Sequence, residues 1–332
     1  NTILAAWLTI LVLATLSYFG LRRMSLVPSG LQNLLEAVVE MFLSLVEGVA
    51  ESTSSLLKVF SGWYSDKLER RKGLVASGYG LSAVTKIFFA LVVTWPQALA
   101  VRFVERVGKG IRTSPRDAII ADSTDPRLMG KAFGFHRAMD TSGAILGSLL
   151  AFLLVASFTY QEIFLISVIP GAIAVVLILL IREGKRAAPK ARSLSLSLAN
   201  LSREFRLFLA IATIFAVANF SYAFLILRAQ DLGVAARETT LYYLLFNVVY
   251  AALAMPFGWL SDKMPKRHVI AAGYGVYGLL TLGFAVATAP HHALVLFLGY
   301  GLFMALIEGT QRAYIPHLVP ENLRGTAYGV FY

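Results

Sequence analysis

The stretch Gly62-Trp63-Tyr64-Ser65-Asp66-Lys67 recurs later in the chain as Gly258-Trp259-Leu260-Ser261-Asp262-Lys263. Each copy ends one apolar run and is followed by a basic turn and a second apolar run. Two more matches follow in the same order: Gly78-Tyr79-Gly80 with Gly273-Tyr274-Gly275, and segment 130–134 with segment 325–329. This ordered repeat predicts a chain built from two related halves.

The composition of the chain excludes a water-soluble globule. Of 332 residues, 57% are hydrophobic and only 15% are charged, which is too little polar material to cover a soluble domain of this size. Apolar runs of about 20 residues, the length that crosses a bilayer as a helix, recur along the chain. The sequence lacks the alternating pattern of a membrane barrel. We therefore predict an all-α fold, a polytopic helical bundle in a membrane.

The apolar runs predict the membrane spans and the division of the chain. The long break at 183–204 is interpreted as a basic cytoplasmic linker between an N-terminal half, residues 1–182, and a C-terminal half, residues 205–332. Because the chain starts without Met and stops soon after an eleventh run opens near residue 325, we interpret it as a fragment whose C-terminal half is incomplete. The earlier spans are predicted at 1–20, 36–62, 73–95, 97–121, 131–157, 160–182, 205–228, 239–260, 268–289 and 292–316.

Positive charge gathers in every second loop of this predicted bundle. A net charge of +11 would suggest nucleic-acid binding in a soluble protein. Here the cations mark the loops that stay in the cytoplasm, so we predict an inner-membrane protein without a nucleic-acid partner. The cations on that side include Lys67, Arg70, Arg71, Lys72, Arg112, Arg116, Arg127, Lys131, Lys263, Lys266, Arg267 and Arg324.

The repeated stretch resembles the motif Gly-x-x-x-Asp-(Arg/Lys)-x-Gly-(Arg/Lys)-(Arg/Lys) of the major facilitator superfamily, which lies between the second and third spans. The resemblance runs from about residue 47 to the end, and it implies that this loop gates access between the two halves. Glu69 and Pro265 stand where the family has Gly, which affects the tightness of the turn. The implied gating residues are Gly62, Asp66, Lys67, Arg70 and Arg71, with Gly258, Asp262 and Lys263 in the second copy.

The chemistry of these residues agrees with a gating role. Gly62 allows two helices to approach closely, and Asp66 can cap a helix or pair with a cation. The alternative is a basic turn that has no gating role. Further along, Arg102 stands where the family has a buried Arg linked to proton coupling. Gly143-x-x-x-Gly147 resembles part of the family's antiporter motif, but Ser148 replaces its Pro, which favours plain helix packing as the role of the two glycines.

Ionisable residues inside predicted spans are candidates for coupling or substrate binding, because such groups are costly in a membrane. Glu47, Glu51 and Lys58 lie on one face of the second span and predict a water-filled path in which Glu51 carries a proton. The alternative is that both glutamates are solvated at the outer mouth. In the fifth span Arg137 and Asp140 can neutralise each other. The candidates are Glu47, Glu51, Lys58, Arg102, Arg112, Arg137, Asp140 and Glu308.

The first 45 residues do not fit this pattern. Arg22 and Arg23 would lie outside the membrane, against the charge rule. The stretch 21–40 resembles the membrane subunit a of rotary ATP synthases, and this resemblance ends near residue 45. It implies either a proton-translocating ATP synthase subunit or a spliced, non-transporting chimera as alternatives to a carrier.

The sequence offers no site for covalent chemistry. It contains no nucleophile with a base, no metal-ligand cluster and no phosphate loop, since Gly108-Lys109-Gly110 is too short for one. We therefore expect neither an enzyme nor a cofactor nor a metal. The leading hypothesis is a secondary active transporter, a monomer, that moves a small molecule by alternating access and uses protons or another ion as its drive.

Overall fold

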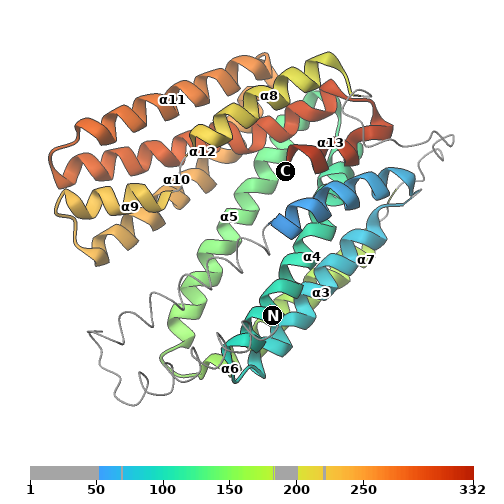
Figure 1. Ribbon diagram of the computed structural model, residues 1–332, viewed down its shortest axis with the longest axis horizontal. Helices are drawn as coiled ribbons and strands as arrows, with labels where there is room; N and C mark the ends of the chain where they lie inside the picture. The colour runs from blue at the N-terminus through green and yellow to red at the C-terminus, as the bar shows by residue number, and fades with distance from the viewer. Residues whose placement is uncertain (1–51, 69, 182, 184–200, 220–221) are drawn as a thin grey trace, which may run out of the picture.

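The computed structural model describes residues 52–68, 70–181, 183, 201–219 and 222–332, and the residues in these ranges form helices and connecting turns without a strand (Figure 1). Six helical segments in this part are long and apolar enough to cross a membrane. The prediction of an all-α polytopic membrane bundle is thereby confirmed. Residues 1–45, with the predicted first span and its two arginines, lie outside the described residues.

The helices follow the predicted spans closely, with two differences. The run at 160–182 forms two helices that meet at Ser167, whose hydroxyl donates to the carbonyl of Phe164 at 2.7 Å. The run at 205–228 is also two helices, because the backbone of Asn219 is extended. The elements are a helix at 52–67, α3 (Lys72–Ala90), α4 (Trp95–Asp122), η2 (Pro126–Leu128), α5 (Met129–Leu154), α6 (Tyr160–Ile166), α7 (Val168–Leu180), α8 (Arg203–Ala218), α9 (Tyr222–Asp231), α10 (Ala236–Lys263), α11 (Lys266–Val286), α12 (Pro290–Leu318), η4 (Glu321–Leu323) and α13 (Arg324–Phe331).

Helix α4 differs from the other long helices in its charge. It has 28 residues but is not one of the six apolar segments, since ionised side chains occur along its whole length. Arg112 and Arg116, which we counted among the cytoplasmic cations, lie within α4, as the predicted span at 97–121 requires, and the helix continues to Asp122. Arg112 donates a hydrogen bond to Ser82 of α3, whereas Arg116 pairs with the adjacent Asp117 of α4 itself.

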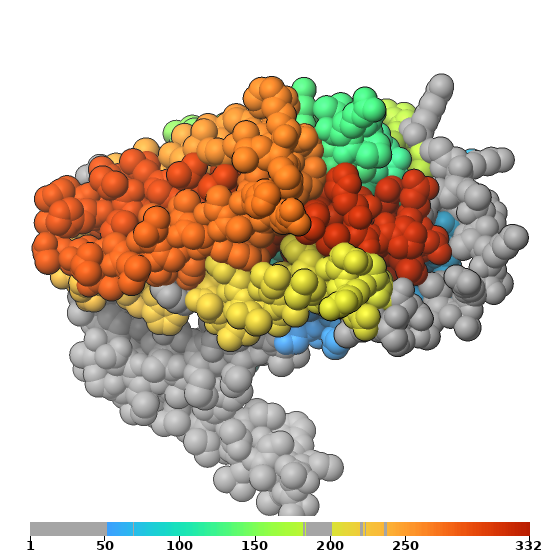
Figure 2. Space-filling view, turned by 90° about the horizontal axis from the view of Figure 1, so that it is seen from above, coloured from blue at the N-terminus to red at the C-terminus, as the bar shows by residue number. Residues whose placement is uncertain are grey.

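Two helices pass from one part of the bundle to the other. Helix α3 packs on α4 and α7, while α12 packs on α10 and α11. Helix α5 leaves the first group and crosses onto α10 and α12, and α13 crosses in the opposite sense onto α4 (Figure 1). In Figure 2 the C-terminal residues (red) lie between α8 (yellow) and green residues of the first part. The exchanged helices α5 and α13 therefore join the two parts.

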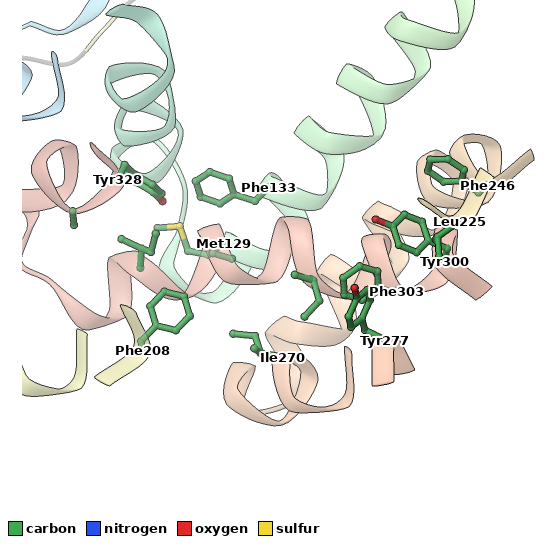
Figure 3. Close-up of a cluster of buried hydrophobic side chains, with 14 of the residues drawn as sticks. Met129, Phe133, Phe208, Leu225, Phe246, Ile270, Tyr277, Tyr300, Phe303 and Tyr328 are labelled. Carbon is green, nitrogen blue, oxygen red and sulfur yellow. The ribbon is translucent and has the colours of Figure 1, made fainter. Parts of the chain in front are cut away.

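A buried apolar core accompanies this exchange (Figure 3). Met129 and Phe133 of α5 lie in one cluster with Phe208 of α8 and Tyr328 of α13. The rings of Phe133 and Tyr328 have centroids 5.9 Å apart. Between helices in a membrane such side chains stabilise the packing through close van der Waals contact, because the lipid tails around them are equally apolar. In contrast, α6 and α7 bury none of their residues, as expected of helices that face lipid.

Candidate functional site

The carboxylate of Asp66 caps the start of α13. The first turn of a helix leaves backbone N–H groups without partners, and α13 has no capping side chain of its own. Asp66 accepts hydrogen bonds from the amides of Gly325 at 2.9 Å and Thr326 at 2.7 Å. It also accepts from the Thr326 hydroxyl at 2.7 Å. The cap therefore comes from the other part of the bundle, as the sequence chemistry of Asp66 allows.

The second copy of the motif makes the same contact with α5. Asp262 accepts from the amides of Gly130 at 2.7 Å and Lys131 at 2.8 Å, the equivalent positions in the first turn of that helix. Helix α5 likewise has no capping side chain of its own. The repeats thus pair crosswise, each aspartate with the helix of the opposite part. We call the end of the bundle that carries Asp66 and Asp262 the motif end.

Glycines allow this approach at both contacts. A Cβ built at Gly62 would lie 2.1 Å from the carbonyl oxygen of Gly325, and one at Gly258 would lie 2.2 Å from that of Gly130. Any side chain at either position would overlap backbone atoms, which cannot move aside as a flexible side chain does. Close packing through small residues is typical of helices in membranes.

The cations of the two copies differ. The fully buried Arg71 pairs with Asp66 at 2.5 Å and with Asp122 at 2.6 Å, and Arg324 joins the same Asp122 at 2.8 Å. In the second copy a single cation, Lys266, pairs with Asp262 at 3.0 Å. The contact between Asp66 and α13 therefore has more ion pairs around it than the contact between Asp262 and α5.

The remaining motif cations lie at the surface of the motif end. Lys67 and Lys263 lie over the rings of Trp63 and Trp259, with 3.7 and 3.6 Å from Nζ to the ring centroids. Arg70 is exposed and contacts no side chain in the described part of the chain. The structure therefore distinguishes Arg70 from Arg71, which the sequence pattern treats alike.

Inside the bundle, charged side chains from α4 and α12 meet around Asp117, together with Tyr332, which directly follows α13. This carboxylate is fully buried and pairs with Arg116 at 2.8 Å. It accepts a hydrogen bond from the hydroxyl of Tyr332 and lies 3.8 Å from Arg312. The group joins both parts of the chain next to the core shown in Figure 3.

The predicted pair Arg137 and Asp140 belongs to the same network. Their side chains are 2.9 Å apart, and Arg137 also lies 3.3 Å from Glu308 of α12. Glu308 in turn pairs with Arg312 at 2.6 Å. Arg137 donates to the hydroxyl of Tyr250 on α10 at 2.8 Å. Breaking a buried pair leaves an uncompensated charge, so the alternating charges of this network stabilise one arrangement of the helices.

The other predicted candidates lie at the edge of this network, apart from it, or outside the described residues. Lys58 lies over the ring of Tyr332, 5.2 Å from its centroid. Arg102 pairs with Glu105 of its own helix at 2.9 Å. No described atom lies within 4 Å of a Cβ built at Gly143 or Gly147, so no described contact supports helix packing there. Glu47 and Glu51 fall outside the described residues.

Several residues of the site were not among the sequence predictions. Asp117, Asp122 and Tyr250 were not singled out, and neither was the hydroxyl of Tyr332. The available signal was Arg116-Asp117, two adjacent charges within a span, which we assigned to its cytoplasmic end. Their partners come from α12 and α13, so only the fold brings these charges together.

Replacing Glu308 with glutamine is expected to lower the stability of the folded protein by about 3–5 kcal/mol, because Arg137 and Arg312 then lose their shared carboxylate. The same replacement at Glu321, whose side chain is 80% exposed, provides the control and should cost about 0–1 kcal/mol. Thermal unfolding of both variants in detergent tests this difference. Equal unfolding midpoints would contradict a structural role for Glu308.

These features define a class: a helical membrane protein whose two repeated parts close on each other at one end. The sequence model of the Major Facilitator Superfamily matches residues 10–332. An uncharacterised transporter of this type from Methanocaldococcus jannaschii is 40% identical over 298 residues, which are 87% of this chain and 75% of that protein. The chain therefore belongs to the Major Facilitator Superfamily of membrane transporters, with two pseudo-symmetric halves.

More distant proteins agree with this family. The multidrug resistance protein MdtL of Escherichia coli O157:H7 is 27% identical over 249 residues, 72% of this chain and 62% of that protein. A solved structure of the Escherichia coli fucose:proton symporter FucP superposes with a TM-score of 0.70, at 18% identity, over 90% of this chain and 84% of that one. The family match from residue 10 includes most of the first 45 residues, and the comparisons give no support to an ATP synthase subunit or a chimera.

Proposed function

We propose that this transporter moves a small molecule across the inner membrane by alternating access, as a monomer, with protons as the coupling ion. The crosswise capping by Asp66 and Asp262 is the observation that carries the proposal. These contacts are non-covalent and lie at one end only, so they can release when the halves rock against each other. The basic loops assign this end to the cytoplasm.

The role that we propose for each group of residues follows from its position. The gating residues at the motif end keep the transporter in the state that is closed at this end. The two halves that move against each other are residues 1–182 and 205–332, and residues 183–204 link them. The network of Arg137, Asp140 and Glu308 lies at the interface of these halves. A proton that neutralises one of its carboxylates would weaken the ion pairs between the halves, which couples proton binding to their motion. The proposed function is transport, and it requires no enzymatic step.

Transport itself is measured in proteoliposomes with imposed gradients. We expect a proton gradient to drive the uptake of at least one member of a broad panel of solutes, and a sodium gradient of equal size to drive none. If only the sodium gradient drives uptake, the proposal that protons are the coupling ion is wrong. If neither gradient drives uptake of any solute in the panel, the proposal that the protein is a secondary active transporter is wrong.

Alternating access is measured directly by spin labels, since the chain contains no cysteine. Arg127 and Arg267 are exposed at the motif end, one in each half, and can be replaced by cysteine and labelled. We expect electron paramagnetic resonance to show two populations of distances, a short one from the closed motif end and a longer one. The ratio should change with pH. A single distance at every pH would contradict both gating and proton coupling.

A further inference from the structure

Helix α4 uses two faces for packing and turns a third face towards α5. A Cβ at Gly108 would lie 2.9 Å from the carbonyl oxygen of Gly78 on α3, and one at Gly110 would lie 2.9 Å from that of Ser54 in the helix 52–67. Lys109 stands between these glycines and is exposed. Its electrostatic neighbours include Asp140 of α5. The glycines therefore fix the helix so that Lys109 lies off both packed faces, near the midpoint of α4.

Lys109 forms no ion pair in the described part of the chain. The charged groups with the strongest effect on it are two cations, Arg106 and Arg112, and two carboxylates, Asp140 and Glu105. Each carboxylate is already paired with another cation, Asp140 with Arg137 at 2.9 Å and Glu105 with Arg102 at 2.9 Å. Positive charge is therefore in excess around Lys109, at a depth where an unpaired charge is costly.

Arg112, one turn further along α4, is held in place by neutral groups. Its Nη1 donates to the hydroxyl of Ser82 at 2.5 Å and to the carbonyl of Gly78 at 3.5 Å. The ring of Tyr79 lies 4.3 Å from the guanidinium carbon. Among the described residues, Nε and Nη2 donate no hydrogen bond. A guanidinium fixed on one side, with donors left on the other, is suited to bind a carboxylate or phosphate through two parallel hydrogen bonds.

We propose that Lys109 and Arg112 bind a negatively charged group of the transported molecule, a carboxylate or a phosphate, so that the substrate is an organic anion. The inference rests on the proposed transport function and specifies its substrate class. The bound anion supplies the counter-charge that both cations lack among the described residues. An anionic lipid headgroup has the same chemistry, so the test must distinguish the two sources.

The test is a thermal-unfolding screen of the purified protein in nanodiscs of zwitterionic lipid. The library holds equal numbers of anionic, neutral and cationic metabolites of similar size. We expect the compounds that raise the unfolding midpoint to be anionic, and Lys109→Gln and Arg112→Gln each to weaken their binding at least tenfold. The control Arg206→Gln removes one exposed cation at the start of α8 and should bind as the unchanged protein does.

The unliganded variants separate binding from a structural role. Because neither cation has an ion pair among the described residues, Lys109→Gln should unfold without ligand at or above the midpoint of the unchanged protein. Arg112→Gln loses only hydrogen bonds to neutral groups and should unfold close to that midpoint. The proposal is overturned if the stabilising compounds are neutral or cationic, if anions bind both variants normally, or if no compound stabilises the protein. It is also overturned if only nanodiscs with an anionic lipid stabilise the unchanged protein, since the headgroup is then the ligand.

The outcome is distinguishable from failure of the proposed function. Gradient-driven uptake of a neutral or cationic solute would uphold transport and overturn the anion site. Conversely, the protein could bind anions through Lys109 and Arg112 but take up no solute under any gradient. That result would overturn the proposed transport function and uphold the anion site.

Discussion

Replacing Gly62 with valine is expected to open the motif end. The new Cβ would lie 2.1 Å from the carbonyl oxygen of Gly325 and 3.2 Å from the Cβ of Ser114. Overpacking of this kind typically costs about 1–3 kcal/mol, and here the overlap is with backbone, so we expect about 3 kcal/mol. That is roughly a hundredfold shift of the equilibrium away from the closed motif end.

The spin-labelled pair at 127 and 267 measures this shift, as loss of the short-distance population. The control is Gly80→Val on α3, where a Cβ meets no described atom within 4 Å. Both changes introduce the same β-branched side chain into a helix, so any difference reports the contacts of Gly62 with α13 and α4. If Gly62→Val keeps the short distance, the glycine contact does not hold the gate.

The repeat in the sequence marked two equivalent stretches, but not the partners of their residues. The close approach at Gly62 and the helix cap by Asp66 agree with what the chemistry of these residues allows, and Asp262 repeats the cap in the second copy. The pairing of Gly62 with Gly325, and of Gly258 with Gly130, depends on how one half lies across the other. Local patterns carry no information on that rotation, although the third repeated segment contains both partner glycines.

The interior charges show a different limit of sequence reasoning. A carboxylate such as Asp117 is stable at depth only when cations surround it, and those cations come partly from α12. Sequence rules place charges at span ends unless a partner is visible nearby. For Arg137 and Asp140, three residues apart on one helix, the partner was visible and the pair was predicted. For Asp117 and Arg312 it was not, since the two residues meet only through the fold.

The two motif contacts are not equivalent, and this asymmetry predicts unequal roles. Asp66 is fully buried against an arginine that is itself fully buried, and the hydroxyl of Thr326 adds a further donor. Asp262 has a lysine and two amides. A carboxylate with more donors loses more when its charge is removed, so the first contact should dominate the closed state.

Replacing Asp66 with asparagine therefore has the largest expected effect of any single change at the motif end. Asparagine keeps one acceptor oxygen, so either the amide of Gly325 or the amide and hydroxyl of Thr326 lose their acceptor. Arg71 loses one of its two carboxylate partners and keeps only Asp122. Removing one member of a buried ion pair costs about 3–5 kcal/mol, which corresponds to a shift of roughly a hundredfold to several thousandfold towards the open motif end.

The matched variant Asp262→Asn makes the same chemical change in the second copy and should shift the equilibrium less. Spin-label distances at 127 and 267 rank the two variants without knowledge of the substrate, and thermal unfolding shows whether each protein remains folded. Equal shifts would mean that the extra bonds of Arg71 and Thr326 contribute nothing to gating. A larger shift for Asp262→Asn would instead mean that the contact between α5 and α10 holds the gate, because α5 packs along α10 and α12 beyond its first turn.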